Sequence, residues 1–179
     1  MPQVLARLLA EPAVVLLHSA EAARHFARAC DARSLARGYI ALAALESTDS
    51  PKQVAALQRG LKAVPGNPTL TMFLGSIHER QGRLDAAISV YEAAVAKNPA
   101  DTVMSNNLVA LLLDRGKDKA SLARALQIAR PFATSNDPLL LDTLGWAHFR
   151  NDDFPSAVLV LERAVAAEQN NALLQYHLG

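Results

Sequence analysis

Cysteine and net charge are both almost absent from this chain. Cys30 is the single cysteine among 179 residues, so neither an internal disulfide nor a cysteine zinc site can form. Eighteen Lys and Arg side chains face 17 Asp and Glu, which leaves a formal net charge of +1. Because the basic residues are scattered, the sequence favours neither nucleic acid nor an anionic membrane surface as a partner.

Long apolar runs are also missing. The most apolar segment, VLARLLAEPAVVLL, is interrupted by Arg7, Glu11 and Pro12, whereas a transmembrane helix needs ~18 uninterrupted apolar residues. No basic leader precedes it as in a signal peptide. We therefore expect no direct membrane insertion. Since 51% of the residues are hydrophobic, we expect a folded chain with a sizeable core.

Two distant stretches of the chain copy each other. In LGWAHFRNDD, Leu144, Gly145 and His148 have the same spacing as Leu74, Gly75 and His78 in LGSIHERQGR. Laying the glycine column in register gives Ala41, Gly75, Val109, Gly145 and Gly179, at intervals of 34, 34, 36 and 34 residues. Such regular spacing predicts an internal repeat instead of a unique active site.

The pattern inside each repeat predicts two helices. Apolar residues three and four apart describe one buried helical stripe, as in Leu84, Ala87, Ile88, Tyr91, Ala94 and Val95. Pro51 and Pro155 stand where second helices would begin, and Ser50 can cap the former. Pro131 should end its helix early, and the two extra residues of the third repeat should lengthen the turn around 117–120. No strand-like alternation competes, so we expect an all-α fold of ten or eleven helices.

The unit beginning near Pro68 resembles the tetratricopeptide repeat (TPR) column by column, through Leu74-Gly75, Gly82, Ala87, Tyr91, Ala94 and Pro99. Thr71 and His78 replace its usual Trp and Tyr. The resemblance implies a right-handed α-solenoid of helix-turn-helix repeats. Its units would be 34–67, 68–101, 102–137, 138–171 and the start of another at 172–179. Residues 1–33 would form N-terminal helices, as a degenerate repeat or cap.

The candidate catalytic and metal-binding residues have simpler explanations. His78 and His148 occupy the column of a packing aromatic, so buried or half-buried imidazoles are expected there. Asp152 falls in the turn-glycine column; with His148 it makes two potential metal ligands, too few for a site. His177 is expected at the surface or packed between helices. No serine or cysteine has a base fixed beside it. We therefore expect no catalytic residues, no metal, no cofactor and no enzymatic activity.

The family resemblance implies instead a concave groove, lined by the first helices, that receives a partner peptide or helix. In three of the units the repeat positions that would face the groove are Met72, Ser76, Glu79, Arg80, Asn106, Ala110, Leu113, Asp114, Asp142, Trp146, Phe149 and Arg150. The more degenerate first unit would add Leu42, Leu45 and Glu46. They contain no lysine, which argues against a clamp for a partner's terminal carboxylate. Trp146 and Phe149, with Leu113 and Tyr176 nearby, are the expected anchor. The alternative is that Trp146 only fills the space between repeats.

The sequence thus predicts a non-enzymatic protein–protein interaction module. Alternatives are a structural array of a bacterial envelope or exopolysaccharide system, or a regulatory part of a larger enzyme. The C-terminal repeats are also similar, more weakly, to bacterial TPR lipoproteins of the exosortase/exopolysaccharide (PEP-CTERM) type. That similarity would imply anchoring in the periplasm or at the outer membrane; otherwise the protein would be cytoplasmic. Leu173, Leu174 and Leu178, with no closing helix, predict an apolar C-terminal edge that could support a homodimer.

Overall fold

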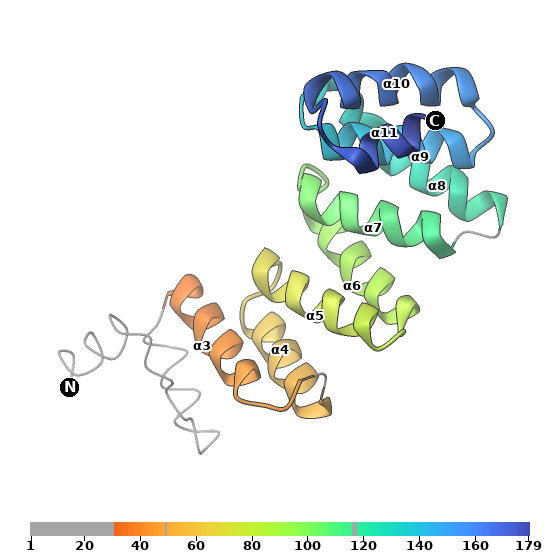
Figure 1. The fold of residues 1–179 in the computed structure, drawn as a ribbon. Coiled ribbons are helices and arrows are strands. Elements are labelled where there is room, and N and C mark those ends of the chain that lie inside the picture. Colours follow the sequence, from red (N-terminus) through yellow and green to blue (C-terminus); the bar gives the residue numbers. More distant parts are fainter. Residues whose placement is uncertain (1–30, 49, 116–117) are drawn as a thin grey trace, which may run out of the picture. The chain divides into compact units, whose positions relative to one another are not determined.

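The computed structural model describes residues 31–48, 50–115 and 118–179, and every regular element in these ranges is helical. They form nine α-helices, α3 to α11, and one 3-10 helix, η1 (Figure 1). The predicted all-α fold is confirmed. The expectation for residues 1–33 lies almost wholly outside the described residues. The chain divides into two compact units, 1–90 and 91–179, and the division falls within α6 (Leu84–Lys97).

The described part of the first unit consists of three helices followed by the first half of α6. They are α3 (Ala32–Ala44), α4 (Pro51–Ala63) and α5 (Pro68–Arg80). Helix α4 packs against α3 and α5, and α5 also contacts α3. The core between them is aliphatic, with Leu35, Ala36, Ala43, Val54, Ala56, Leu57, Val64, Leu70, Leu74 and Ile77. Each helix therefore buries its apolar stripe against both its partner and the next repeat.

The second unit repeats the same arrangement. Its elements are α7 (Thr102–Arg115), α8 (Lys119–Ala129), η1 (Arg130–Thr134), α9 (Pro138–Arg150), α10 (Phe154–Ala167) and α11 (Ala172–Leu178). Helix α9 packs against its partner α10 and also against α7, α8 and α11 (Figure 1). Helix α9 is consequently the central element of this unit.

The glycine column of the sequence corresponds to equivalent places in the helices. Gly75, Val109 and Gly145 are each the eighth residue of α5, α7 and α9, and all three are buried. At Gly145 a Cβ atom would lie 2.5 Å from Cγ of Leu161, far inside normal contact distance. The absence of a side chain here lets α9 and α10 approach closely. Gly179 is likewise the eighth position counted from Ala172, the first residue of α11, and it is exposed as the last residue of the sequence.

Capping residues fix most helix starts. Aspartate, asparagine or serine side chains accept a hydrogen bond from a first-turn backbone N–H at Asp31, Ser50, Asn67, Asp101, Asp118, Asp137, Asp153 and Asn171. Each such cap typically stabilises a helix by ~1 kcal/mol. Ser50 and the proline starts at Pro51 and Pro155 are as predicted. The turn between α9 and α10 also matches, because Asp152 has φ 61°, close to the φ 68° of Gly82.

The third repeat is two residues longer than its neighbours. The turn between α7 and α8, which the sequence predicts to be lengthened around 117–120, includes residues 116–117 and so lies partly outside the described residues. One extra residue precedes Lys119, where α7 is one residue longer than α5 and α9. The other follows it, where Pro131 ends α8 at Ala129 and the chain continues as η1. The early end was predicted, and η1 buries Phe132 in the core.

The apolar surface exposed at the C-terminal edge is smaller than the sequence indicates. Leu173 is 53% exposed, but Leu174 is completely buried and Leu178 is partly buried. Helix α11 therefore uses one of its three leucines to pack onto α9 and α10 and leaves one fully available at the surface.

Candidate functional site

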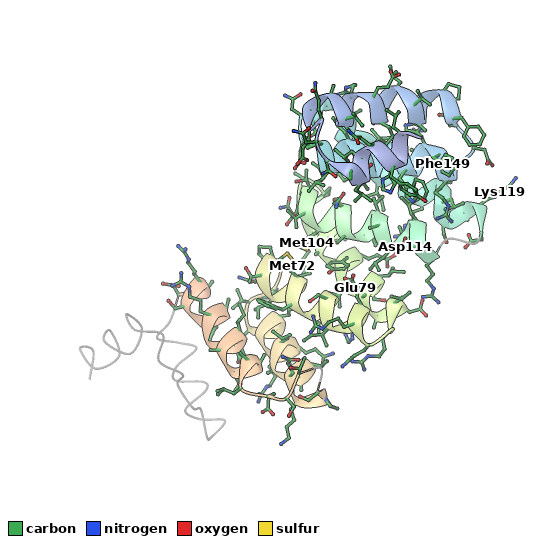
Figure 2. The ribbon with its side chains drawn as sticks, in the orientation of Figure 1. Met72, Glu79, Met104, Asp114, Lys119 and Phe149 are labelled. Atoms are coloured by element: carbon green, nitrogen blue, oxygen red, sulfur yellow. The ribbon has the colours of Figure 1, made fainter. Side chains whose placement is uncertain are left out.

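The residues of the predicted groove divide between the two units. Met72, Ser76, Glu79 and Arg80 lie on α5, where Met72 is exposed and the Ser76 hydroxyl accepts a hydrogen bond of 3.4 Å from Arg80. The other eight lie on α7 and α9 of the second unit. Figure 2 labels Met104 and Asp114 on α7 and Phe149 near the C-terminal end of α9.

Four aromatic rings of the second unit form a continuous series, here called the aromatic ladder. Trp146 stacks on Phe149 with ring centroids 4.9 Å apart and planes at 14°. Its ring also stacks on His177 at 5.1 Å and 19°. Phe149 in turn meets Phe154 edge to face at 5.6 Å. The ladder therefore joins α9 to α10 on one side and to α11 on the other.

Much of this ladder is accessible to a partner. Phe149 is 43% exposed and Phe154 is 52% exposed, while Trp146 and His177 are half-buried. Tyr176 is 79% exposed and its ring is tilted against His177 at 5.9 Å. Exposed aromatic rings in mutual contact are uncommon on a surface that binds nothing, because they leave apolar area in water.

The polar groups around the ladder are paired with one another. The carboxylate of Asp142 accepts a hydrogen bond of 2.8 Å from Nδ1 of His177, and both side chains are largely buried. Arg150 donates to the backbone carbonyl of Leu113 at 2.5 Å. The first pair couples α9 to α11, and the second couples α9 to α7. Both charged side chains of α9 in the predicted groove therefore connect neighbouring repeats.

Backbone carbonyls at the end of α9 are likewise occupied. The carbonyl of Ala147 accepts from the Asn151 side chain at 2.8 Å, and that of His148 accepts from the N–H groups of Asn151 and Asp153. The carbonyl of Phe149 accepts from the N–H of Asp152 at 3.0 Å. The carbonyls of Ala147, His148 and Phe149 therefore already have donors, and what these residues leave for a ligand is chiefly the aromatic surface of Phe149.

The structure changes the roles of several predicted residues. Leu113 is only 1% exposed, so its side chain belongs to the core and only its carbonyl takes part in the site. Trp146 does contact Phe149, as expected, but its ring also packs against the next repeat. His177 packs between α11 and α9, which is one of the two placements expected for it, but its contacts with Asp142 and Trp146 were not predicted. Sequence reasoning overlooked Phe154, and no repeat column marks it.

The metal and acid–base candidates do not assemble into a site. His148 pairs with Asp153 at 2.9 Å, and not with Asp152, whose left-handed conformation places it in the turn. Hydrogen bonds from Ser156, chiefly from its hydroxyl, hold the pKa of Asp153 below its ordinary value, and His148 adds to this shift. Within the described ranges no three potential ligands come together as a metal site would require.

Two further observations concern function classes. His78 is buried, as expected for the packing-aromatic column, and burial lowers its pKa, with the charge of Arg83 acting in the same direction. Among the described helices, none combines the length and the apolar character that crossing a bilayer demands.

Helix-turn-helix repeats that stack on their sequence neighbours define the class of α-solenoid repeat scaffolds, whose extended surfaces serve binding. A model of the family described as tetratricopeptide repeat matches residues 40–102 and 74–135, together just over half of the chain. The chain belongs to the tetratricopeptide repeat family. This family consists of non-enzymatic interaction scaffolds, and the chain is accordingly a protein–protein interaction module. The aromatic ladder lies beyond the matched residues, in helices that continue the same repeat.

Solved structures share the fold at low sequence identity. The C-terminal part of a TPR repeat-containing protein from Cytophaga hutchinsonii has a TM-score of 0.59 at 17% identity, covering 99% of this chain and 69% of that one. A MamA structure, labelled AMB-1, has a TM-score of 0.59 at 15% identity, covering 99% and 86%. MamA from Desulfovibrio magneticus RS-1 has 0.52 at 23% identity, covering 95% and 94%. A search of curated proteins found no significant match.

Proposed function

We propose that the second unit captures a peptide segment of a partner protein on the face formed by its first helices and the start of α10, with the aromatic ladder as the anchor. The observation that carries this proposal is that exposed Phe149 stacks on Trp146 and meets exposed Phe154 edge to face. Stacked rings are rigid, so they bury apolar area on binding with little loss of side-chain entropy.

The remaining groove residues take supporting roles in the proposal. Ala110 and Asp114 are exposed on α7 and would border the peptide. The side-chain oxygen of Asn106 is buried and has no hydrogen-bond partner among the described residues, so this atom lies out of reach of a peptide. In the first unit, Met72 offers a separate apolar contact on α5, next to Ser76, Glu79 and Arg80 on the same helix.

Anchor residues should dominate the affinity. Truncating a buried aromatic at an interface commonly costs ~2 kcal/mol or more, and ~1.4 kcal/mol already corresponds to a tenfold loss. Phe149→Ala is the better probe than Trp146→Ala, because Trp146 also packs against His177 of α11. We expect Phe149→Ala to weaken a captured peptide at least about tenfold while circular dichroism shows unchanged helicity.

The experiment selects peptides from a random displayed library on the purified chain and measures their affinity by titration. Leu159→Ala provides the matched control, since Leu159 is an exposed apolar residue of α10 outside the ladder. Selected peptides should bind the Leu159→Ala protein as they bind the parent. If they bind the Phe149→Ala and Phe154→Ala proteins equally well, the ladder is not the anchor and the proposal fails.

A further inference from the structure

His177 connects helix α11 to the aromatic ladder through two contacts of one imidazole ring. Its Nδ1 donates a hydrogen bond of 2.8 Å to the carboxylate of Asp142, and its ring stacks on Trp146 at 5.1 Å and 19°. Asp142 and Trp146 are both residues of α9, spaced so that they lie one turn apart on the same face of the helix. A single side chain of α11 therefore contacts α9 at two successive turns.

Neither His177 nor Asp142 is well placed to bind a partner directly. The side chains of both are largely buried, whereas Phe149 and Phe154 are exposed. Trp146 lies between the two groups, because its ring also stacks on Phe149 at 4.9 Å. An effect of His177 on binding would thus pass chiefly through Trp146 to the exposed rings.

Helix α11 is short and has few side chains with which to dock. It spans seven residues, and Leu174 is the only one of them that is buried. A helix of this length is marginal in water on its own, so α11 depends on its packing against α9 and α10. Elements with few buried contacts open locally at less than the free energy of global unfolding. Docked and undocked α11 are therefore two states that this unit can populate.

We propose that His177 is a positioning residue of the ladder, and that the docking of α11 through His177 controls the affinity of the site. The inference rests on the proposed function and names how that site is regulated. With α11 docked, the bond to Asp142 orients the imidazole, the imidazole orients the indole, and the indole orders the ring of Phe149 before a partner arrives. An ordered ring loses less side-chain entropy on binding. With α11 undocked, Trp146 and Phe149 regain rotamer freedom, so binding must order them again.

The coupling is reciprocal, because a ligand that prefers the docked state must stabilise docking by the same factor. The test uses a peptide selected on the parent chain from the displayed library described above. We expect His177→Ala to weaken this peptide at least about fivefold, and saturating peptide to slow amide hydrogen exchange in α11 of the parent protein by a similar factor. Leu173→Ala is the matched control, since Leu173 is exposed on the same helix, and it should change neither quantity.

Two comparisons distinguish positioning from a general loss of structure. In a Phe149→Ala background, His177→Ala should change the affinity by less than about twofold, because its route to the ligand is already interrupted. Asp142→Asn keeps an acceptor for the imidazole N–H, so it should retain most of the affinity that Asp142→Ala loses. Additive losses in the double variant would overturn the inference, as would equal losses for the two Asp142 variants.

The free protein provides an independent measurement. Trp146 is the only tryptophan of the sequence, and removal of the imidazole leaves more of the indole in water, so His177→Ala should move its fluorescence emission to longer wavelength. Unchanged emission would contradict the positioning contact. If the selected peptide binds through Phe149 and Phe154 but binds the His177→Ala protein as it binds the parent, the proposed function stands and only the positioning role fails. If binding is independent of both phenylalanines, the proposed function itself fails, and the inference fails with it.

Discussion

Replacing Gly145 with alanine tests whether the closest helix contact of the repeat is as tight as the structure shows. The added Cβ would lie 2.5 Å from Cγ and 2.6 Å from Cδ2 of Leu161, whereas carbon atoms normally stay about 3.5–4.0 Å apart. Leu161 is buried, so its side chain has no open space into which to rotate. The two helices must separate by roughly 1 Å or Leu161 must take a strained rotamer.

The expected magnitude follows from two opposing effects. Overpacking of a dense core costs ~1–3 kcal/mol, while alanine favours a helix interior over glycine by ~1 kcal/mol. The difference leaves a net loss in the free energy of unfolding of up to ~2 kcal/mol for Gly145→Ala. Urea unfolding, followed through the fluorescence of Trp146 on the same helix, measures the change in midpoint.

A double-variant cycle provides the control. Leu161→Ala alone should cost ~2–5 kcal/mol, because it leaves a cavity. In the double variant the new methyl group of residue 145 occupies part of that cavity, so the two costs should fall short of additivity by at least ~1 kcal/mol. A Gly145→Ala protein more stable than the parent, or strictly additive costs, would show that α9 and α10 are not in close contact.

Two other predictions concern the turns and pH. Gly82→Ala should destabilise the chain by ~1 kcal/mol through backbone strain alone, since its φ is 68° and no atom lies within 4 Å of the added Cβ. A rise in urea midpoint for Gly82→Ala would contradict the assigned conformation. Asp152→Gly, at φ 61°, should be neutral or stabilising. Because burial lowers the pKa of His78 below its ordinary value of 6.5, the unfolded chain binds a proton more readily, so stability should fall as pH drops below about 6.5. His78→Tyr, which restores the usual aromatic of this column, should flatten that pH dependence of the urea midpoint, and equal slopes for both proteins would refute it.

The sequence predicted the repeat itself because the repeat is enforced by local geometry. Gly145 must be small where two helices meet, Asp152 stands where the turn needs a positive φ, and Pro131 cannot continue α8. Each constraint acts within a few residues of the chain, so spacing alone reveals it. The two extra residues of the third repeat are harder to place from the sequence, because helix length and the η1 turn can each absorb one of them without disturbing the column pattern.

The candidate site was less predictable because its contacts run between repeats. The Asp142–His177 hydrogen bond joins residues 35 positions apart, and no periodicity determines which side chain a given imidazole meets. Leu113 was assigned to the groove from its column alone, yet the twist of neighbouring helices buries its side chain and leaves its carbonyl to Arg150. The column of a residue determines the direction in which its side chain leaves the helix axis. Whether that side chain is exposed depends on how the neighbouring repeat packs against it.

Trp146 shows why packing and binding need not be alternative roles. Its ring stacks on both Phe149 and His177, which together cover part of the indole. This coverage fixes the orientation of the ring and, through it, the position of Phe149, whose own surface remains 43% exposed. A side chain immobilised in this way loses little entropy when a partner binds. The packing of α11 onto α9 through His177 therefore prepares the surface that Phe149 and Phe154 present, and loosening that packing should weaken binding even where no contact to the ligand is lost.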